Sequence, residues 1–281
     1  MDKMTFFKAR QWAFSFANTH NKETSGVELL LLGQMHWSAT QLLVHFHDVM
    51  PDQEWQTFQT NVQRYCLEDY PPQYLLGKAD FFGLKLAVSP ATLIPRLETE
   101  ELVEWILAEH SNKPHKVLDL GTGTGAIGLA LKQNRPQWEV TLADISSAAL
   151  TVAQKNAAAL ALPVTLINSD LFADIRDDDY DIIVSNPPYI SPAERPLMDQ
   201  SVLQYEPALA LFAADDGLAV YKKIAHQVQA HLRPAGMLYL EIGFKQGPAV
   251  KALFEQEIPT SQVVVRQDIS QNDRMVRVKM R

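Results

Sequence analysis

Four consecutive residues, Asn186-Pro187-Pro188-Tyr189, have the properties needed to hold a planar nitrogen group. A primary amide or exocyclic amine carries two N–H donors, and the Asn186 side-chain oxygen and the Pro187 carbonyl offer two acceptors. The prolines stiffen the turn, and the Tyr189 ring supplies a flat face for the planar group. Paired acceptors favour the positive charge that develops as nitrogen attacks a methyl group. We therefore predict methyl transfer to nitrogen, with Asn186, Pro187 and Tyr189 catalytic and all four residues binding substrate.

A glycine-rich run, Gly121-Thr122-Gly123-Thr124-Gly125, has the properties of a cofactor loop. Glycines let the backbone approach a ligand closely, and the N-terminus of a following helix favours an anion such as a methionine carboxylate. Asp144 ends the next apolar segment, where a carboxylate can accept hydrogen bonds from both ribose hydroxyls. The spacing is G-x-G-x-G, whereas dinucleotide sites use G-x-G-x-x-G. The pattern therefore predicts S-adenosylmethionine, and neither NAD nor FAD.

Asp170 and Leu171 close the third apolar segment of this region. In a doubly wound sheet, that position borders the crevice at the carboxyl ends of the strands. Leu171 could then pack on an adenine ring, and Asp170 could accept hydrogen bonds from the adenine amino group. An aspartate that only caps the next turn is an equally good interpretation of Asp170. Together with the glycine loop, Asp144 and Asn186, these two residues complete the predicted cofactor site.

These residues need a scaffold that brings the ends of several strands together. From residue 116 onward, apolar strand-like segments alternate with helical ones, which predicts a parallel, doubly wound α/β sheet. A polar-alternating last segment, residues 274–279, suits an antiparallel strand. Strands are predicted at residues 117–120, 140–144, 164–168, 180–185, 237–242, 263–265 and 275–278.

The chain before this sheet has a different pattern. Residues 1–70 carry apolar side chains at helical spacing, and no anion-binding turn, so they are predicted to form a substrate-recognition domain. Residues 71–110 are predicted to form a β-hairpin followed by a helix, which links the first domain to a methyltransferase domain at residues 111–281.

Composition narrows the possible partners. The formal net charge is −8 and no basic run occurs. Proteins that bind DNA or RNA usually carry a basic face, so a protein or small-molecule partner is favoured and no nucleic-acid substrate is expected. Cys66 is the only cysteine, which excludes an intrachain disulfide and a thiolate metal cluster, and we expect no metal. Neither a signal peptide nor a membrane-length apolar run is present, so a cytoplasmic location is predicted.

Several longer motifs resemble one family, the protein-(glutamine-N5) methyltransferases of peptide chain release factors, also called HemK-like or PrmC. The matching segment runs from about Gln73 to the C-terminus. The motifs are Gln73-Tyr74-Leu75-Leu76-Gly77, Val88-Ser89-Pro90-Ala91-Thr92-Leu93-Ile94-Pro95-Arg96, Glu98-Thr99-Glu100, the glycine loop, Ile183-Val184-Ser185-Asn186-Pro187-Pro188-Tyr189-Ile190 and Glu206-Pro207-Ala208-Leu209.

This resemblance implies a helical N-terminal domain, a hairpin linker and a Rossmann-like methyltransferase domain with seven strands. It implies that the methyl acceptor is the glutamine of a Gly-Gly-Gln loop in a release factor. Cofactor binding carries over to residues 121–125, Asp144, Leu171 and Asn186, and substrate binding to residues 186–189. Leu97 stands where the family usually has a second proline, which leaves the roles of Arg96 and Glu98 open.

Three other functions are compatible with parts of this pattern. A glutamine methyltransferase of a ribosomal protein would share the glycine loop and the Asn-Pro-Pro-Tyr turn. An adenine-N6 nucleic-acid methyltransferase would share the turn, but it needs a basic groove and a pocket for a flipped base. A non-catalytic cofactor-binding module would not need Asn186 or Tyr189. Methyl-transfer assays on the corresponding acceptors distinguish these functions.

Overall fold

The computed structural model describes residues 3–176 and 179–281, which divide into two compact units. The helical unit comprises the chain up to Lys78 together with Asp199–Tyr205. The sheet unit comprises Ala79–Met198 and Glu206–Arg281. The later segment of the helical unit is separated in sequence from its first segment by the greater part of the sheet unit.

The helical unit is built around a small apolar core. Its helices are α1 (Phe6–Thr19), α2 (Thr24–Met35), α3 (Ala39–Val44), α4 (Asp52–Glu68), α5 (Pro72–Leu76) and α9 (Gln200–Tyr205). Ala9, Ala13 and Ala17 are fully buried on one face of α1, since residues four apart stack on the same side of a helix. They pack with apolar side chains of α2 and α4, including Leu30 and Phe58. The predicted N-terminal helical region is therefore confirmed.

Helix α9 joins the helical unit through an aromatic contact that the residue pattern does not predict. The Tyr205 hydroxyl donates a hydrogen bond to the carbonyl of Glu68, with an O–O distance of 2.7 Å. The rings of Tyr70 and Tyr205 lie 4.6 Å apart, and the Arg64 guanidinium lies 4.1 Å from the centre of the Tyr70 ring. These contacts attach a segment from beyond the Asn-Pro-Pro-Tyr turn to the helices of the N-terminal region.

The sheet unit contains the predicted α/β fold. A separate hairpin is formed by β1 (Lys78–Phe81) and β2 (Leu84–Ala87). The main sheet has seven strands in the order β5-β4-β3-β6-β7-β9-β8, and β9 runs antiparallel to both of its neighbours, β7 and β8. The strands are β3 (Lys116–Leu120), β4 (Glu139–Asp144), β5 (Thr165–Asn168), β6 (Tyr180–Ser185), β7 (Leu232–Glu241), β8 (Gln262–Gln267) and β9 (Asp273–Lys279).

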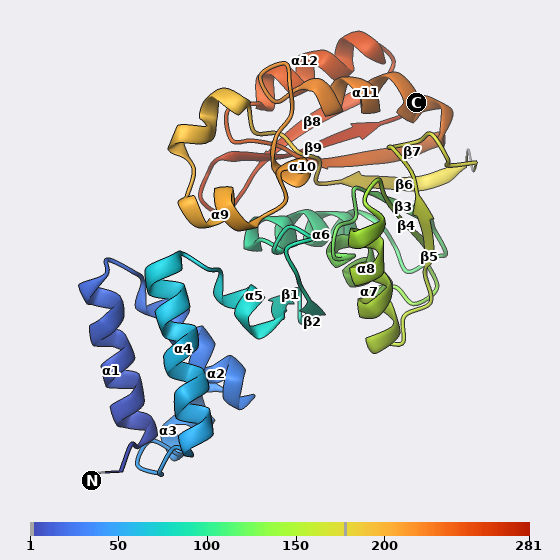
Figure 1. The fold of residues 1–281 in the computed structure, drawn as a ribbon. Helices are drawn as coiled ribbons and strands as arrows, with labels where there is room; N and C mark the ends of the chain where they lie inside the picture. Colours follow the sequence, from blue (N-terminus) through green and yellow to red (C-terminus); the bar gives the residue numbers. More distant parts are fainter. Residues whose placement is uncertain (1–2, 177–178) are drawn as a thin grey trace. The chain divides into compact units, whose positions relative to one another are not determined.

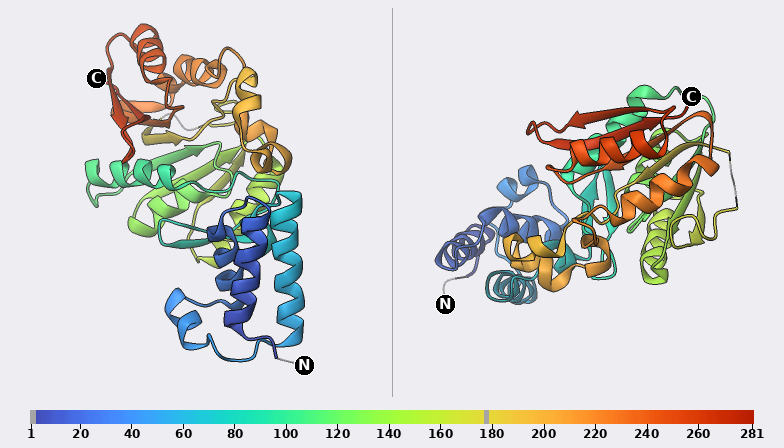
Figure 2. Two further views of the ribbon diagram at one scale, coloured as in Figure 1. Left: turned by 90° about the vertical axis from the view of Figure 1, so that its left-hand side faces the viewer. Right: turned by 90° about the horizontal axis from the view of Figure 1, so that it is seen from above.

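Helices cover both faces of this sheet (Figure 1; Figure 2 gives two further directions). One face carries α6, α7 and α8, and the other carries α11 and α12. Alternate strand residues serve the two cores: Val117 and Ile182 pack on the first side, whereas Leu118 and Ile183 pack on the second. The bounds of the helices and turns of this unit are α6 (Leu97–Glu109), α7 (Ala126–Asn134), α8 (Ser147–Ala159), η1 (Pro192–Leu197), α10 (Ala208–Leu211), α11 (Ala219–Gln227), η2 (Val228–Ala230) and α12 (Gly247–Glu257).

The strand order places the ends of β3, β4, β6 and β7 side by side. Leu120 pairs with Ala143 on one side and with Ser185 on the other, and Ser185 pairs in turn with Leu240. The loops after these strands therefore start at one level, as expected for the ligand crevice of an open α/β sheet. Among residues 3–176 and 179–281, no helix is long and apolar enough to cross a membrane.

Candidate active site

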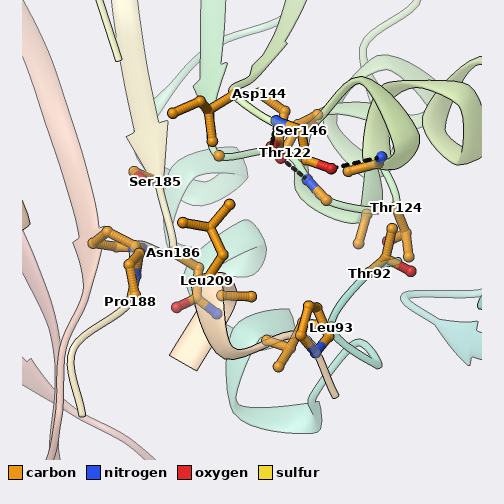
Figure 3. A pocket seen from close by; sticks show the side chains of 18 of the residues that line it. Thr92, Leu93, Thr122, Thr124, Asp144, Ser146, Ser185, Asn186, Pro188 and Leu209 are labelled. Carbon is orange, nitrogen blue, oxygen red and sulfur yellow. Dashed lines mark hydrogen bonds between the residues drawn. The ribbon is translucent and has the colours of Figure 1, made fainter. Parts of the chain in front are cut away.

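A cavity of about 330 Å³ lies at these strand ends, within the volume range of small-molecule sites. It brings together most of the predicted site residues (Figure 3). The predicted residues that line it are Gly121, Thr122, Gly123, Thr124, Asp144, Asp170, Leu171, Asn186, Pro187 and Pro188. The two other predicted residues, Gly125 and Tyr189, do not line this cavity. The glycine loop and the Asn-Pro-Pro-Tyr turn therefore face one cavity.

The glycine loop adopts the backbone conformation that its composition predicts. Gly121 and Gly123 have φ values of +68° and +57°, in the left-handed region where a Cβ atom is strained. A Cβ built on either glycine would meet no atom of the described residues within 4 Å, so the loop backbone is open to the cavity. Gly125 serves a different purpose, since it precedes α7 as its N-cap with a φ of +83°.

Asp119, a buried residue near the end of β3, anchors the glycine loop. Its Oδ2 atom accepts hydrogen bonds from the Thr122 hydroxyl, at 2.6 Å, and from the Gly128 N–H, at 2.9 Å. Burial raises the pKa of Asp119 to about 6, although both hydrogen bonds oppose this shift. Asp119 therefore fixes the loop to the first turn of α7, and it is not among the cavity-lining residues.

Asp144 connects the glycine loop to the next strand. Its Oδ2 atom accepts a hydrogen bond from the Gly123 N–H at 2.9 Å, and its Oδ1 atom accepts one from the Ser146 N–H at 2.8 Å. Burial raises the pKa of Asp144, while these two backbone donors act in the opposite direction. A carboxylate oxygen has more than one lone pair, so both oxygens can still accept a hydrogen bond from a ligand hydroxyl.

Leu171 and Asp170 lie just beyond β5, which ends at Asn168. Leu171 has a φ of +52°, an uncommon conformation for a branched residue, and the Ser169 hydroxyl donates to its carbonyl at 2.8 Å. Its half-buried side chain lines the cavity, where it can pack on a flat ring. Asp170 also lines the cavity, but it is exposed.

The Asn-Pro-Pro-Tyr turn follows β6, whose residues are all buried. The Ser185 hydroxyl donates to the carbonyl of Leu120 at 2.7 Å and so fixes the end of β6 against β3. Asn186, which lies across the cavity from Asp144 in Figure 3, donates through Nδ2 to the Thr99 hydroxyl oxygen at 3.3 Å. The Asn186 Oδ1 atom therefore remains to accept a hydrogen bond from a ligand.

Tyr189 is fixed by hydrogen bonds to residues that do not line the cavity. Its hydroxyl donates to the Glu241 carboxylate at 3.3 Å, and its carbonyl accepts a hydrogen bond from Gln246 Nε2 at 2.9 Å. A Cβ on Gly217 would lie 2.0 Å from that carbonyl oxygen, so only glycine fits there. Burial and the nearby Glu241 raise the pKa of the Tyr189 hydroxyl, which stays protonated and able to donate.

One charged pair near the cavity was not predicted from the residue pattern. The Glu206 carboxylate, with its side chain 2% exposed, forms an ion pair with Arg96 and accepts a hydrogen bond from the Ile94 N–H at 3.1 Å. It ties together two cavity-lining segments, one at Leu93–Arg96 and the other beginning at Pro207. Both residues occur in motifs noted above, but their sequence separation gives no sign that they pair.

Leu97, the departure from the family motif, occupies the first position of α6. Its side chain is 76% exposed, and Arg96 is the N-cap residue. A proline is favoured at this position because its φ suits a helix and the N–H there needs no helical partner. The helix also begins at this position with leucine, and Arg96 forms its ion pair with Glu206.

Two family models match separate parts of the chain. The model described as PrmC N-terminal domain matches residues 8–77, and the model described as Methyltransferase small domain matches residues 99–204. The release factor glutamine methyltransferase of Enterococcus faecalis is 42% identical over 270 residues, covering 96% of this chain and 97% of that protein. The corresponding protein of Lactococcus lactis is 50% identical over 220 residues, covering 78% and 81%.

The chain belongs to the release factor glutamine methyltransferase family. A solved methyltransferase from Pyrococcus furiosus, 15% identical, shares the fold with a TM-score of 0.54, covering 82% of this chain and 98% of the other. The predicted methyltransferase fold, cofactor class and enzyme class thus agree with the comparisons. As a member of the release factor glutamine methyltransferase family, the protein uses S-adenosylmethionine, and the open backbone of Gly121 and Gly123 beside Asp144 fits that cofactor.

Proposed function

We propose that the protein methylates the side-chain amide nitrogen of the glutamine in the Gly-Gly-Gln loop of peptide chain release factors. The observation that carries this proposal is the position of Asn186 and Pro187 in the wall of the same cavity as the glycine loop and Asp144. The turn is the part of this cavity that suits a planar NH2 group. The relatives named above are release factor glutamine methyltransferases, which supports a glutamine amide as that group.

The cofactor supplies an electrophilic methyl group on a sulfonium sulfur. In the proposed site, the methionine carboxylate would be held at the Gly121–Gly125 loop by the start of α7 and by loop N–H groups other than those of Thr122, Gly123 and Gly125, which already donate within the protein. Asp144 would accept hydrogen bonds from the ribose hydroxyls, Leu171 would pack on the adenine and Asn186 would border the methionine portion. Asp170 is proposed to accept from the adenine amino group, and its exposure predicts a smaller contribution than that of Asp144.

The catalytic turn compensates for the poor nucleophilicity of an amide, whose nitrogen lone pair is delocalised into the carbonyl. Asn186 Oδ1 and the Pro187 carbonyl accept the two N–H donors and so orient the nitrogen toward the methyl group. The same acceptors would stabilise the positive charge that develops on nitrogen as its bond to the methyl carbon forms and the methyl–sulfur bond breaks. The nitrogen then loses one proton to solvent, and the sulfur is left as a neutral thioether. Tyr189, predicted as a flat face for the amide, does not line the cavity, and we propose instead that it supports the turn through its hydroxyl and carbonyl hydrogen bonds.

We assign recognition of the release factor to the N-terminal helices, predicted as a domain at residues 1–70. The hairpin and helix of residues 71–110 would then be the linker, and residues 111–281 the catalytic domain. The described helical unit extends to Lys78 and includes Asp199–Tyr205, so recognition would also involve the segment that follows the catalytic turn. We also propose a cytoplasmic location, since the proposed substrate is a translation factor.

The function is tested by methyl transfer from labelled cofactor to three purified acceptors in parallel: a release factor, a ribosomal protein and duplex DNA. We expect label in the release factor, and none after the glutamine of its Gly-Gly-Gln loop is replaced by alanine. If label were transferred to the ribosomal protein or to DNA and none to the release factor, the proposed substrate would be wrong.

A further inference from the structure

Glu241 is a buried carboxylate directly behind the catalytic turn, 1% exposed. The strand register explains its position: Ser185 of β6 pairs with Leu240 of β7, so Glu241, the last residue of β7, lies at the level of Asn186, which follows β6. An ionisable group is rarely buried so completely without partners that use its charge. Glu241 is not among the residues that line the cavity, so it acts through its neighbours.

Two hydroxyl groups donate to this carboxylate. The Thr99 hydroxyl donates to Glu241 Oε2 at 2.6 Å, and the Tyr189 hydroxyl donates to Oε1 at 3.3 Å. The first distance is typical of a hydroxyl that donates to an ionised oxygen. Thr99 lies in the first turn of α6 and is 4% exposed. Glu241 therefore contacts both a helix residue and the last residue of the catalytic turn.

The hydrogen bonds form a chain with one allowed direction. An ionised carboxylate can only accept, so the single Thr99 hydroxyl hydrogen points to Glu241, and the Thr99 oxygen must accept from its other neighbour. That neighbour is Asn186, which donates through Nδ2 at 3.3 Å. A flipped Asn186 amide would bring Oδ1 against the Thr99 oxygen with no hydrogen between the two atoms. These hydrogen bonds thus select the amide orientation in which Asn186 Oδ1 can accept a hydrogen bond from the substrate.

We infer that Glu241 and Thr99 are positioning residues, which hold the Asn186 amide with its oxygen directed to the substrate nitrogen. This inference rests on the proposed function, because the orientation matters only for an acceptor that donates N–H groups. With a flipped amide, the Asn186 NH2 group would face the NH2 group of the substrate, and both would be donors. The sequence motif Glu98-Thr99-Glu100 thereby gains a specific role for its central residue.

The variants Thr99→Val and Thr99→Ser test this inference. Valine keeps the shape of threonine but removes the hydroxyl, whereas serine keeps the hydroxyl. In single-turnover assays with saturating cofactor and release factor, we expect Thr99→Val to lower the methyl-transfer rate about 10- to 100-fold, the effect of misplacing a catalytic group. Thr99→Ser should recover most of the wild-type rate. Affinity for S-adenosylmethionine and KM for the release factor should change little in either variant.

Three results would contradict the inference. One is a wild-type rate in Thr99→Val, and another is an equal loss of rate in both variants. The third is a loss confined to KM or cofactor affinity, which would indicate a general packing role. If the wild-type enzyme itself does not methylate the release factor, the proposed function fails, and this inference fails with it. An active wild-type enzyme with an equally active Thr99→Val variant would overturn the inference alone.

Discussion

Asn186 must present an oxygen to the substrate, and its surroundings restrict which end of the amide can do so. Its nitrogen donates to Thr99, and its oxygen remains at the cavity. We expect Asn186→Ala to lower the methyl-transfer rate about 10²-fold or more, the effect of losing one transition-state hydrogen-bond partner. Single-turnover kinetics measure this, and Asn186→Asp, which keeps an oxygen but loses the amide donor to Thr99, should retain part of the activity.

Asp144 and Asp170 offer a matched pair of tests for the cofactor site. Asp144 is 8% exposed and already ordered by two backbone N–H groups, so its carboxylate is held ready for a ligand. We expect Asp144→Ala to weaken S-adenosylmethionine binding by about 1.5–3 kcal/mol in calorimetry, the scale of hydrogen bonds to a charged group. Asp170→Ala should cost less, because Asp170 is exposed. A larger loss for Asp170→Ala would reverse the assigned roles.

We expect Glu241 to make the methyl-transfer rate depend on pH. Burial raises the pKa of Glu241, while Thr99, Tyr189 and Arg274 act in the opposite direction, and Glu98 raises it further. Tyr221 also faces this group, and its hydroxyl donates to the Glu241 carbonyl at 2.9 Å.

The hydrogen bonds that run from Asn186 through Thr99 to Glu241 require an ionised Glu241 carboxylate. The methyl-transfer rate should therefore be maximal at pH values above the raised pKa of Glu241, and it should fall as the pH decreases through that pKa. The pH profile of Glu241→Gln should lack this acid limb, because glutamine does not titrate. An unchanged acid limb in that variant would assign it to another carboxyl, such as Asp119, whose pKa is about 6.

At the scale of elements, the catalytic turn depends on a loop far from it in sequence. Gly217, just before α11, has a φ of +83°, and its missing Cβ makes room for the Tyr189 carbonyl. We expect Gly217→Ala to displace the turn and to lower the methyl-transfer rate by up to about 10²-fold, the effect of a shift near 1 Å at a reacting group. Cofactor affinity should remain near the wild-type value.

Gly83→Ala is the control for Gly217→Ala. Gly83 has a similar φ of +78°, but a Cβ there meets no atom of the described residues within 4 Å. It should lower the melting temperature through backbone strain, without a specific loss of rate. Equal losses of rate in the two variants would mean that backbone strain, and not contact with Tyr189, causes the effect.

The sequence predicted those elements whose signal is local. The strands ending at Leu120, Asp144 and Ser185 are apolar runs, and the glycines after β3 mark their turn directly. The partners of the catalytic turn could not be found in this way. Thr99 and Glu241 are 142 residues apart, and Arg96 and Glu206 are 110 apart. Each is an ordinary polar residue in sequence, and only strand order and helix packing bring each pair together.

At the scale of the whole molecule, the helical unit includes chain from both sides of the catalytic turn. Its first segment ends at Lys78 and its second is Asp199–Tyr205, which ends beside Glu206. We expect deletion of residues 1–70 to leave S-adenosylmethionine binding within a few-fold of wild type, because no cavity-lining residue is removed. Methylation of the intact release factor should be lost. A truncated enzyme that methylates the release factor as fast as the full chain would refute the recognition role.

The most direct measurement of the proposed function is the site of modification in the release factor. Purified release factor is incubated with S-adenosylmethionine and either wild-type enzyme or Asn186→Ala, then digested and analysed by mass spectrometry. With wild-type enzyme, we predict that the peptide containing Gly-Gly-Gln gains the mass of one methyl group, located on the glutamine side chain. With Asn186→Ala, the same peptide should remain unmodified over the same time. Methylation at another residue, or equal methylation by both enzymes, would contradict the assignment of the Asn-Pro-Pro-Tyr turn as a glutamine-amide site.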